Sequence, residues 1–268
     1  MSQRVVVTGL GVVAPNGVGL DQYTKALRGG ISGIRQYPQL EELKFGCTVG
    51  GIPQGVDDIA DRYFEEDELL AMNSSHRYGC IAAVDAWTDA GFELPTPGDE
   101  SVDWDSGTIL GTGIGGMDTA GEKLVPLVDT GKVRRLGSTI VEQVMGSGVS
   151  ARVAGLLSLG NQVTANSSAC STGLEAIIEG YHRIIAGRAK RMLCGGTEGS
   201  SHYSWAGFDS MRVLCRSHND EPERASRPLS ASAGGFVPGS GAGILHLESL
   251  ESAQERGVRI YAEILGAG

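Results

Sequence analysis

The chain has 268 residues, of which 41% are hydrophobic and 20% charged, and its formal net charge is −10. This size and balance fit one large globular domain, or two small ones packed together. The negative charge argues against non-specific binding to nucleic acid or to an anionic membrane. The opening MSQRVVVTG lacks the apolar core of a signal peptide, and no apolar run approaches the ~20 residues that span a bilayer, so the expected compartment is the cytoplasm.

Apolar runs typical of buried strands alternate with helical patterns, which predicts an α/β fold around a largely internal sheet. The strand candidates are RVVVTGLGVV at the start, GTILGTG near residue 107, QVTANSS near 162, RMLCGG near 191 and AGILHLE near 242. Glycine ends most of the helix candidates. These candidates cover residues 21–29, 74–91, 138–160, 171–186 and 249–257. Two segments, 50–70 and 200–240, break the alternation and are expected to run over the surface, the second beside a site.

The five cysteines are an odd number, and none forms a C-x-x-C pair with matching histidines, so neither a disulfide framework nor a metal site is predicted. Free cysteine usually behaves as a small core residue. This is the expectation for four of them: Cys47, Cys80, Cys194 and Cys215.

The fifth, Cys170, lies in ANSSACSTG, directly before the amphipathic helix predicted over 171–186. At such a helix start, free backbone N–H groups and the positive end of the helix dipole stabilise a thiolate and can hold a developing oxyanion. The small neighbours leave the sulfur accessible. The residues alone leave two interpretations open, a nucleophilic cysteine and a capping or core residue.

No histidine is an evident base for this thiol. His182 lies twelve residues further along the same helix, which is roughly 18 Å and beyond hydrogen-bond reach. His202 and His218 lie in the second surface segment and could fold back, whereas His76 and His246 lie in helix and strand patterns and are expected to be structural.

Two glycine-rich stretches resemble nucleotide-binding loops. GTGIGG at 111–116 fits G-x-G-x-x-G, and TGLGVVA at 8–14 is a near miss. Neither is followed by the helix and the acidic strand end that the fingerprint requires. No nucleotide cofactor is therefore predicted.

Several motifs follow one another in a characteristic order: VVVTGLGVVAPNG, GTGIGG, SSACSTG, CGGTE, GFDSMRVL and the tail from RPLSASAGGFV to EILGAG. In this order they resemble the β-ketoacyl-acyl-carrier-protein synthases of the elongating type, over essentially the whole chain. The resemblance implies a thiolase-like αβαβα layered fold. Residues 1–250 would form its N-terminal half, and residues 251–268 the connection into a C-terminal half. It also implies a homodimer, or a heterodimer with a related subunit.

The activity implied by the resemblance is decarboxylative Claisen condensation, with no cofactor and no metal. Cys170 would accept an acyl group from a carrier-protein thioester, and the carbanion from malonyl-carrier protein would attack it, giving a 3-oxoacyl product. Ile114 would be the gate of the acyl pocket and Phe208 an aromatic residue near the thiol. Either could instead be plain core.

Carrier docking is also implied by the resemblance. Arg134, Arg135 and Arg212 match basic positions at which the family meets its acidic carrier protein, and they would form the local patch that an acidic protein needs. Another docking stretch, often basic in the family, is acidic here at 65–68. Each arginine could also be an ordinary solvated charge.

Two departures from the family qualify this expectation. The family's two catalytic histidines, its lysine and its glycine-rich phenylalanine loop belong to the C-terminal half, and the chain ends at Gly268, so this chain alone is expected to lack condensation activity. Within 227–241, the family pattern P-F-D-x-x-R-D-G-F-V-x-G-E-G reads PLSASAGGFVPGSG. The acidic residues and the basic residue of the family pattern are replaced together, which indicates that a whole ion-pair cluster has been lost. We therefore expect the chain to belong to a divergent subgroup that serves a specialised polyketide or polyene-like pathway.

Two other functions remain as alternatives. One is a noncatalytic partner subunit of the chain-length-factor kind, which characteristically lacks the cysteine. The other is a coenzyme A-dependent thiolase, which shares the fold and a cysteine but takes coenzyme A thioesters. The GTGIGG and GFDSMRVL segments favour the synthase.

Overall fold

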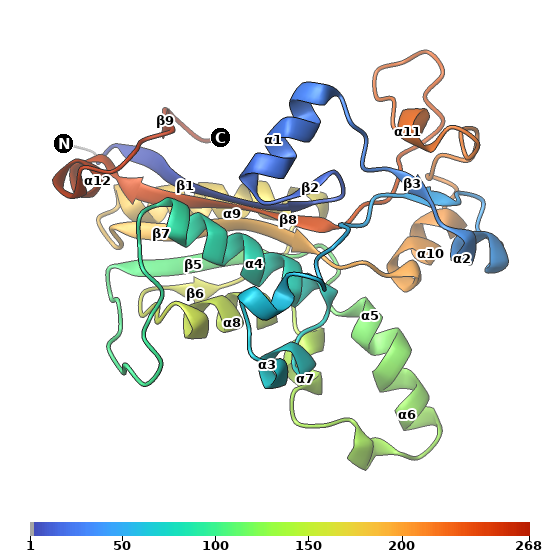
Figure 1. Cartoon of the computed structure of the whole chain (residues 1–268), viewed down its shortest axis with the longest axis horizontal. Coiled ribbons are helices and arrows are strands. Elements are labelled where there is room, and N and C mark those ends of the chain that lie inside the picture. The colour runs from blue at the N-terminus through green and yellow to red at the C-terminus, as the bar shows by residue number, and fades with distance from the viewer. Residues whose placement is uncertain (1–2) are drawn as a thin grey trace.

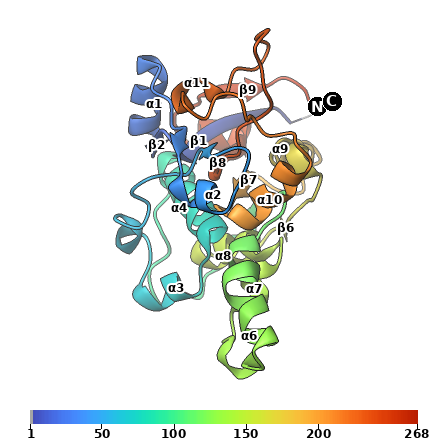
Figure 2. The ribbon, with the colours of Figure 1, turned by 90° about the vertical axis from the view of Figure 1, so that its right-hand side faces the viewer.

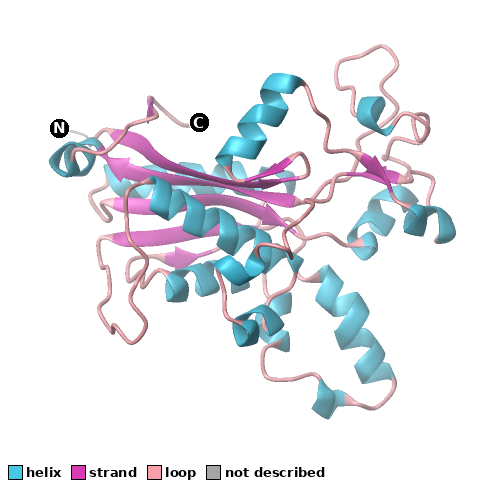
Figure 3. Ribbon diagram, in the orientation of Figure 1, coloured by secondary structure: helices cyan, strands magenta, loops and turns pink. Residues whose placement is uncertain are grey.

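The computed structural model describes residues 3–268 and is built on a seven-stranded mixed sheet (Figures 1 and 3). The strand order is β2-β1-β8-β7-β5-β6, with β9 also paired to β1. The strands are β1 Val5–Ala14, β2 Gly17–Val18, β5 Ser106–Gly111, β6 Val163–Thr164, β7 Arg191–Glu198, β8 Gly241–Ser249 and β9 Ala262–Ile264. A separate two-stranded ribbon pairs β3 Arg35–Gln36 with β4 Val49–Gly50.

The strand directions bring several loops to one edge of the sheet. β5, β6 and β7 are parallel, whereas β8 is antiparallel to both β7 and β1. The carboxyl ends of β1, β5, β6 and β7 therefore lie along the same edge as the amino end of β8. At this edge Gly111 of β5 pairs with Gly196 of β7. Loops that leave such an edge are where open α/β sheets bind ligands.

Helices cover both faces of the sheet, and Figure 2 shows α4 and α9 on opposite sides of the strands. α4 Ser74–Asp89 and α8 Gly148–Leu156 pack on one face, and α9 Thr172–Ile185 packs on the other. The side chains alternate accordingly, because successive strand residues point to opposite faces. Leu110, Leu193 and Ile244 join the α4 core, whereas Ile109, Cys194 and Leu247 join the α9 core.

Short helices and helical turns complete the fold, and α5 and α6 project as a lobe from the sheet edge (Figure 1). The helices are α1 Leu20–Gly29, α2 Pro38–Glu42, α3 Glu66–Leu70, α5 Met117–Thr119, α6 Val125–Asp129, α7 Ile140–Val144, α10 His202–Ser210, α11 Pro222–Ala225 and α12 Leu250–Arg256. The turns are η1 Ala60–Arg62, the π-helical η2 Ala120–Leu124, η3 Val133–Arg135 and η4 Ala169–Ser171. Within residues 3–268, no helix combines the length and the apolar character needed to cross a membrane.

The α/β alternation predicted from the sequence is confirmed, but one predicted helix is wrong. The helix expected over 138–160 is two helices, α7 and α8. The first ends because the backbone at Met145 is extended, with ψ 134°. Gly146, Ser147 and Gly148 follow, and glycine weakens a helix interior. The segment 200–240 is not purely irregular either, since it contains α10 and α11.

Candidate active site

Cys170 lies in a turn at the start of α9. Of the five cysteines it alone is exposed, while Cys47, Cys80, Cys194 and Cys215 are buried as predicted. The residue before it, Ala169, has φ +52°. A left-handed backbone costs a non-glycine residue about 1–2 kcal/mol, so the surrounding structure must impose this conformation. The exposed thiol therefore sits on a sharp, strained turn between a strand end and a helix.

Side-chain hydrogen bonds hold this turn. The backbone N–H of Ser168 donates to Thr172 Oγ1 at 2.9 Å, and the side-chain amide of Asn166 donates to the carbonyl of Thr172 at 3.0 Å. The same amide donates to Ser168 Oγ at 3.3 Å. Thr172 is only 2% exposed. The chain on both sides of Cys170 is thus tied to the first buried residue of α9.

Glycines let α9 begin close against the sheet edge. A Cβ at Gly111 would lie 1.9 Å from Thr172 Cγ2 and 2.7 Å from Asn166 Oδ1. A Cβ at Gly196 would lie 3.1 Å from the Cα of Gly173. These contacts leave no room for side chains, which explains Gly111 of GTGIGG and Gly196 of CGGTE without a nucleotide.

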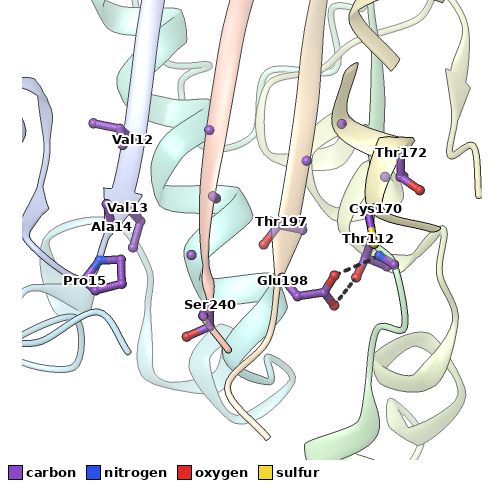
Figure 4. Close-up of a pocket in the computed structure, with 18 of the residues that line it drawn as sticks. Val12, Val13, Ala14, Pro15, Thr112, Cys170, Thr172, Thr197, Glu198 and Ser240 are labelled. Carbon is purple, nitrogen blue, oxygen red and sulfur yellow. Dashed lines mark hydrogen bonds between the residues drawn. The ribbon is translucent and has the colours of Figure 1, made fainter. Parts of the chain in front are cut away.

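Two hollows meet at the thiol. The larger, about 520 Å³, runs along the ends of β1, β7 and β8, and Figure 4 shows Cys170, Thr112 and Glu198 at one side of it. The smaller, about 400 Å³, is mainly apolar. Apolar side chains of the smaller hollow include Ile114, Trp205, Phe208, Phe236 and Val237.

The structure places both predicted acyl-pocket residues beside the thiol. Ile114 and Phe208 line the smaller hollow together with Cys170. Ile114 is 45% exposed, so it stands at the mouth rather than in the core. The sequence did not single out Trp205 and Phe236, although Phe236 packs edge-to-face on Phe208 with 5.3 Å between ring centres. Their role in binding an acyl chain stays a prediction.

Glu198, the last residue of β7, was also missed. Its carboxylate accepts hydrogen bonds from Thr112 Oγ1 at 3.0 Å and from the backbone N–H of Gly113 at 2.9 Å. The only sequence signal was its place at the end of the CGGTE strand. Thr112 directly follows β5, which neighbours β7 in the sheet, so the parallel pairing of β5 and β7 brings the two residues together.

None of the five histidines lines either hollow. His76 and His246 are buried, which agrees with the structural role expected for them, and burial lowers their pKa values to about 4 and about 3, respectively. His182 lies on α9, and the fold brings neither His202 nor His218 to the thiol. The polar groups among the described lining residues are therefore a thiol, hydroxyls, backbone amides, the indole of Trp205 and one carboxylate.

The three predicted docking arginines are exposed. Arg134 and Arg135 lie in η3, which contacts α6, and Arg212 follows α10 with φ +58°. None of the three forms an ion pair with a residue in the described range 3–268. The acidic stretch 65–68 begins α3, where Glu65 and Glu68 form a capping box.

Comparison with known proteins identifies the family to which this fold and site belong. The family model of the beta-ketoacyl synthase N-terminal domain matches residues 2–253, so the chain belongs to this family. A curated relative, 3-oxoacyl-[acyl-carrier-protein] synthase 2 of Vibrio cholerae, is 33% identical over 267 residues. That alignment covers 99% of this chain and 63% of the relative.

Solved structures confirm the thiolase-like layered fold. A beta-ketoacyl synthase from Burkholderia phymatum superposes with a TM-score of 0.88 at 31% identity, over 98% of this chain and 63% of that one. A type II polyketide ketosynthase, bound to a hexaketide and in complex with its acyl-carrier protein, gives a TM-score of 0.85 at 29% identity, over 99% and 63%. The chain thus spans less than two thirds of the length of these relatives.

Proposed function

We propose that this chain provides the acyl-accepting cysteine of a β-ketoacyl-acyl-carrier-protein synthase. The observation that carries the proposal is the placement of Cys170. Its thiol is exposed, lies on a strained turn at the start of a long helix, and borders an apolar hollow that fits a hydrocarbon chain. A cysteine with only a structural role would be buried, as the other four are.

The first step is transfer of an acyl group to this sulfur. The Cys170 thiolate forms a bond to the carbonyl carbon of an acyl-carrier thioester, and the electron pair of the C=O bond moves to oxygen. The first N–H groups of a helix have no partner inside the helix and can stabilise that oxyanion. When the oxyanion collapses, the bond to the carrier sulfur breaks. The carrier thiolate then takes up the proton that Cys170 lost.

The second step would join this acyl group to a malonyl unit. Loss of CO₂ from malonyl-carrier protein leaves a carbanion equivalent, whose attack on the acyl thioester gives a 3-oxoacyl thioester and frees Cys170. This step needs groups that polarise the malonyl carbonyl. The described residues that line the two hollows include no histidine and no lysine. We therefore expect this chain alone to accept acyl groups without condensing them.

An acidic carrier protein is the proposed partner. The exposed Arg134, Arg135 and Arg212 have no anionic partner within residues 3–268, which leaves them available to carrier phosphate and carboxylate groups. The related polyketide ketosynthase forms a complex with such a carrier. The dimeric state, the cytoplasmic location and the specialised pathway stay predictions.

Intact-mass measurement tests the proposal. The protein is incubated with a hexanoyl-carrier thioester, and one acyl adduct is expected. Cys170→Ala should abolish it, while Cys80→Ala, which removes a thiol buried in α4, should retain it. Absence of an adduct on the unsubstituted protein, or an adduct that survives Cys170→Ala, would contradict the proposal and favour the noncatalytic partner subunit.

The pathway and the thioester class are tested with the same readout. Hexanoyl-coenzyme A replaces the carrier thioester, and a strong preference for it would support the thiolase alternative. A series of saturated and polyunsaturated carrier thioesters tests the specialised pathway. Preference for ordinary saturated chains would count against that pathway.

A further inference from the structure

The carboxylate of Glu198 accepts several hydrogen bonds from the loop that contains Ile114. Oε1 accepts from Thr112 Oγ1 at 3.0 Å and from the backbone N–H of Ile114 at 3.4 Å, and Oε2 accepts from the backbone N–H of Gly113 at 2.9 Å. The backbone N–H of Gly115 donates to Thr112 Oγ1 at 3.1 Å. We call Glu198 and residues 112–115 the Glu198 network.

An ionised carboxylate suits this position because it accepts hydrogen bonds through both oxygens and donates none. Hydrogen bonds to a charged acceptor are also about twice as strong as neutral ones. The close approach depends on Gly113, since a Cβ there would lie 2.9 Å from Glu198 Oε2. The loop is thus held by one side chain from the neighbouring strand.

The held loop forms part of the wall beside the thiol. Glu198, Gly113, Ile114 and Cys170 all line the smaller hollow. Beyond Ile114 the chain passes through Gly115 and Gly116, with φ +42° and +67°. These glycines accept backbone conformations that other residues avoid, so they do little to fix the loop. The carboxylate is therefore the main restraint on where Ile114 stands.

The same contacts argue against a proton-transfer role for Glu198. Both of its oxygens are already engaged by the loop, and within residues 3–268 no hydrogen bond joins the carboxylate to the Cys170 thiol. A general base must lie within hydrogen-bond reach of the proton that it abstracts, and among the described residues no such contact joins Glu198 to the thiol. These contacts fit the role of a positioning residue for Glu198, and not that of a catalytic residue.

We propose that Glu198, by holding the 112–115 loop, fixes the Ile114 wall of the apolar hollow and so sets which acyl chain lengths Cys170 accepts. The inference rests on the proposed function. Its substrate class is an unbranched acyl chain on a carrier thioester. With the network intact, the hollow of about 400 Å³ keeps one shape and rejects chains that exceed it. With the network broken, Ile114 moves and long chains enter more easily.

Glu198→Gln is the main test, because it keeps the size of the side chain and replaces one acceptor oxygen with a donor amide. Hydrogen exchange at the backbone amides of Gly113 and Ile114 should accelerate about tenfold or more, since each charged hydrogen bond is worth at least that factor. In competition between hexanoyl- and dodecanoyl-carrier thioesters, the share of dodecanoyl adduct on Cys170 should rise about tenfold. Alkylation of Cys170 by iodoacetamide should stay within about twofold, because the thiol turn is held by other residues.

Two further variants complete the test. Glu179→Gln makes the same chemical change at an exposed position of α9 that has no hydrogen bond within the described residues, and it should leave exchange and chain-length ratio unchanged. Thr112→Val removes the hydroxyl that links Gly115 to Glu198 while keeping the side-chain shape. Thr112→Val should shift the exchange rate and the chain-length ratio in the same direction as Glu198→Gln. It replaces Glu198→Gln as the test if that variant fails to fold.

The outcomes separate the two proposals. Faster exchange with an unchanged chain-length ratio would overturn the inference, since the network would then be only structural. Unchanged exchange would overturn it as well. If the unsubstituted protein forms no adduct with either thioester, the proposed function fails and the selectivity role fails with it.

Discussion

Thr172 Oγ1 accepts a 2.9 Å hydrogen bond from the backbone N–H of Ser168, so a buried side chain of α9 holds the chain that leads into Cys170. Ser168 Oγ also accepts a hydrogen bond from the side-chain amide of Asn166. The carbonyl of Ser168 accepts a hydrogen bond from the backbone N–H of Ser171. The thiol turn is thus fixed from inside the fold. Its rigidity does not depend on the solvent-exposed residues around the sulfur.

Thr172→Val should loosen this turn. The substitution keeps the methyl that packs on Gly111 but leaves the Ser168 N–H without an acceptor, which should cost about 1–3 kcal/mol of unfolding free energy. Misplacement of the sulfur should slow Cys170 acylation about tenfold or more. Urea unfolding and timed intact-mass measurement check both values. Thr96→Val, at an exposed loop position, should change neither, and equal behaviour of the two variants would contradict the role given to Thr172.

Gly111→Ala should separate α9 from the sheet edge. The new methyl would meet Thr172 Cγ2 at 1.9 Å, so backbone must shift, at a cost of about 3 kcal/mol. Gly155→Ala is the matched control, because a Cβ on that exposed residue of α8 meets nothing within 4 Å. Alanine there should stabilise the protein by about 0.5 kcal/mol. Thermal unfolding of both variants gives the comparison, and a stable Gly111→Ala would show that the close approach is not required.

Arg256→Met should strongly destabilise the fold. Arg256 pairs with Glu248, whose side chain is fully buried, at 3.0 Å. Burial raises the pKa of Glu248, but hydrogen bonds from Arg256 and Ser252 outweigh it and leave the pKa below its ordinary value. Loss of the arginine leaves a buried carboxylate unpaired, which should cost about 3 kcal/mol.

Arg4→Met is the control for that pair. Arg4 and Glu263 form an ion pair at 2.5 Å on the surface, where solvent screens the charges. We expect no measurable loss of stability in urea unfolding. If Arg4→Met and Arg256→Met lost similar amounts of unfolding free energy, burial would not explain the cost of removing Arg256.

Acidification should destabilise the protein through its buried histidines. Burial lowers the pKa of His246 to about 3 and that of His76 to about 4. His246 Nδ1 lies 2.7 Å from Thr8 Oγ1. Because the Thr8 hydroxyl donates its proton to Glu248, the Nδ1–H of His246 is the donor in this hydrogen bond, and His246 Nε2 has no partner within residues 3–268. The unfolded imidazoles bind protons below about pH 6.5, whereas the folded ones do not. Stability is therefore full above that pH and should fall by up to about 1.4 kcal/mol per pH unit for each histidine below it.

His246→Leu tests this cause. Between pH 6.5 and pH 4.5, the unfolding free energy of the variant should fall by about half as much as that of the unsubstituted protein, because one of the two titrating groups is gone. Thr8 keeps its bond to Glu248 in this variant. The control, His182→Gln, replaces an exposed imidazole on α9 and should retain the full decline. Identical pH profiles for the two variants would exclude His246 as a source.

Charge reversal at η3 should weaken carrier docking. Arg134→Glu combined with Arg135→Glu should slow association with the acidic carrier about tenfold at low salt, and less at high salt. Arg28→Glu, at the exposed end of α1, is the control and should have little effect. Stopped-flow measurement over a salt series checks the expectation. An unchanged rate would remove η3 from the docking surface.

The sequence by itself determined the elements and pointed to Cys170 as the proposed nucleophile. Strand and helix periods are local properties, so β1, β5, β7, β8, α4 and α9 were all predicted near their observed positions. Cys170 was found for the same reason, since small residues before an amphipathic helix mark a helix start. The split between α7 and α8 was missed because three consecutive small residues outweighed a continuous apolar pattern.

Only the tertiary structure decided what surrounds the thiol. Glu198 meets Thr112 because β5 and β7 pair in parallel, with Gly111 opposite Gly196. Trp205 and Phe236 reach the hollow from a segment whose path has no periodic signal. Such contacts join residues far apart in the chain, and they depend on strand register and on how surface segments fold back. Local spacing carries no information about either, which is why the apolar hollow and the hydrogen bonds of Glu198 emerged only from the fold.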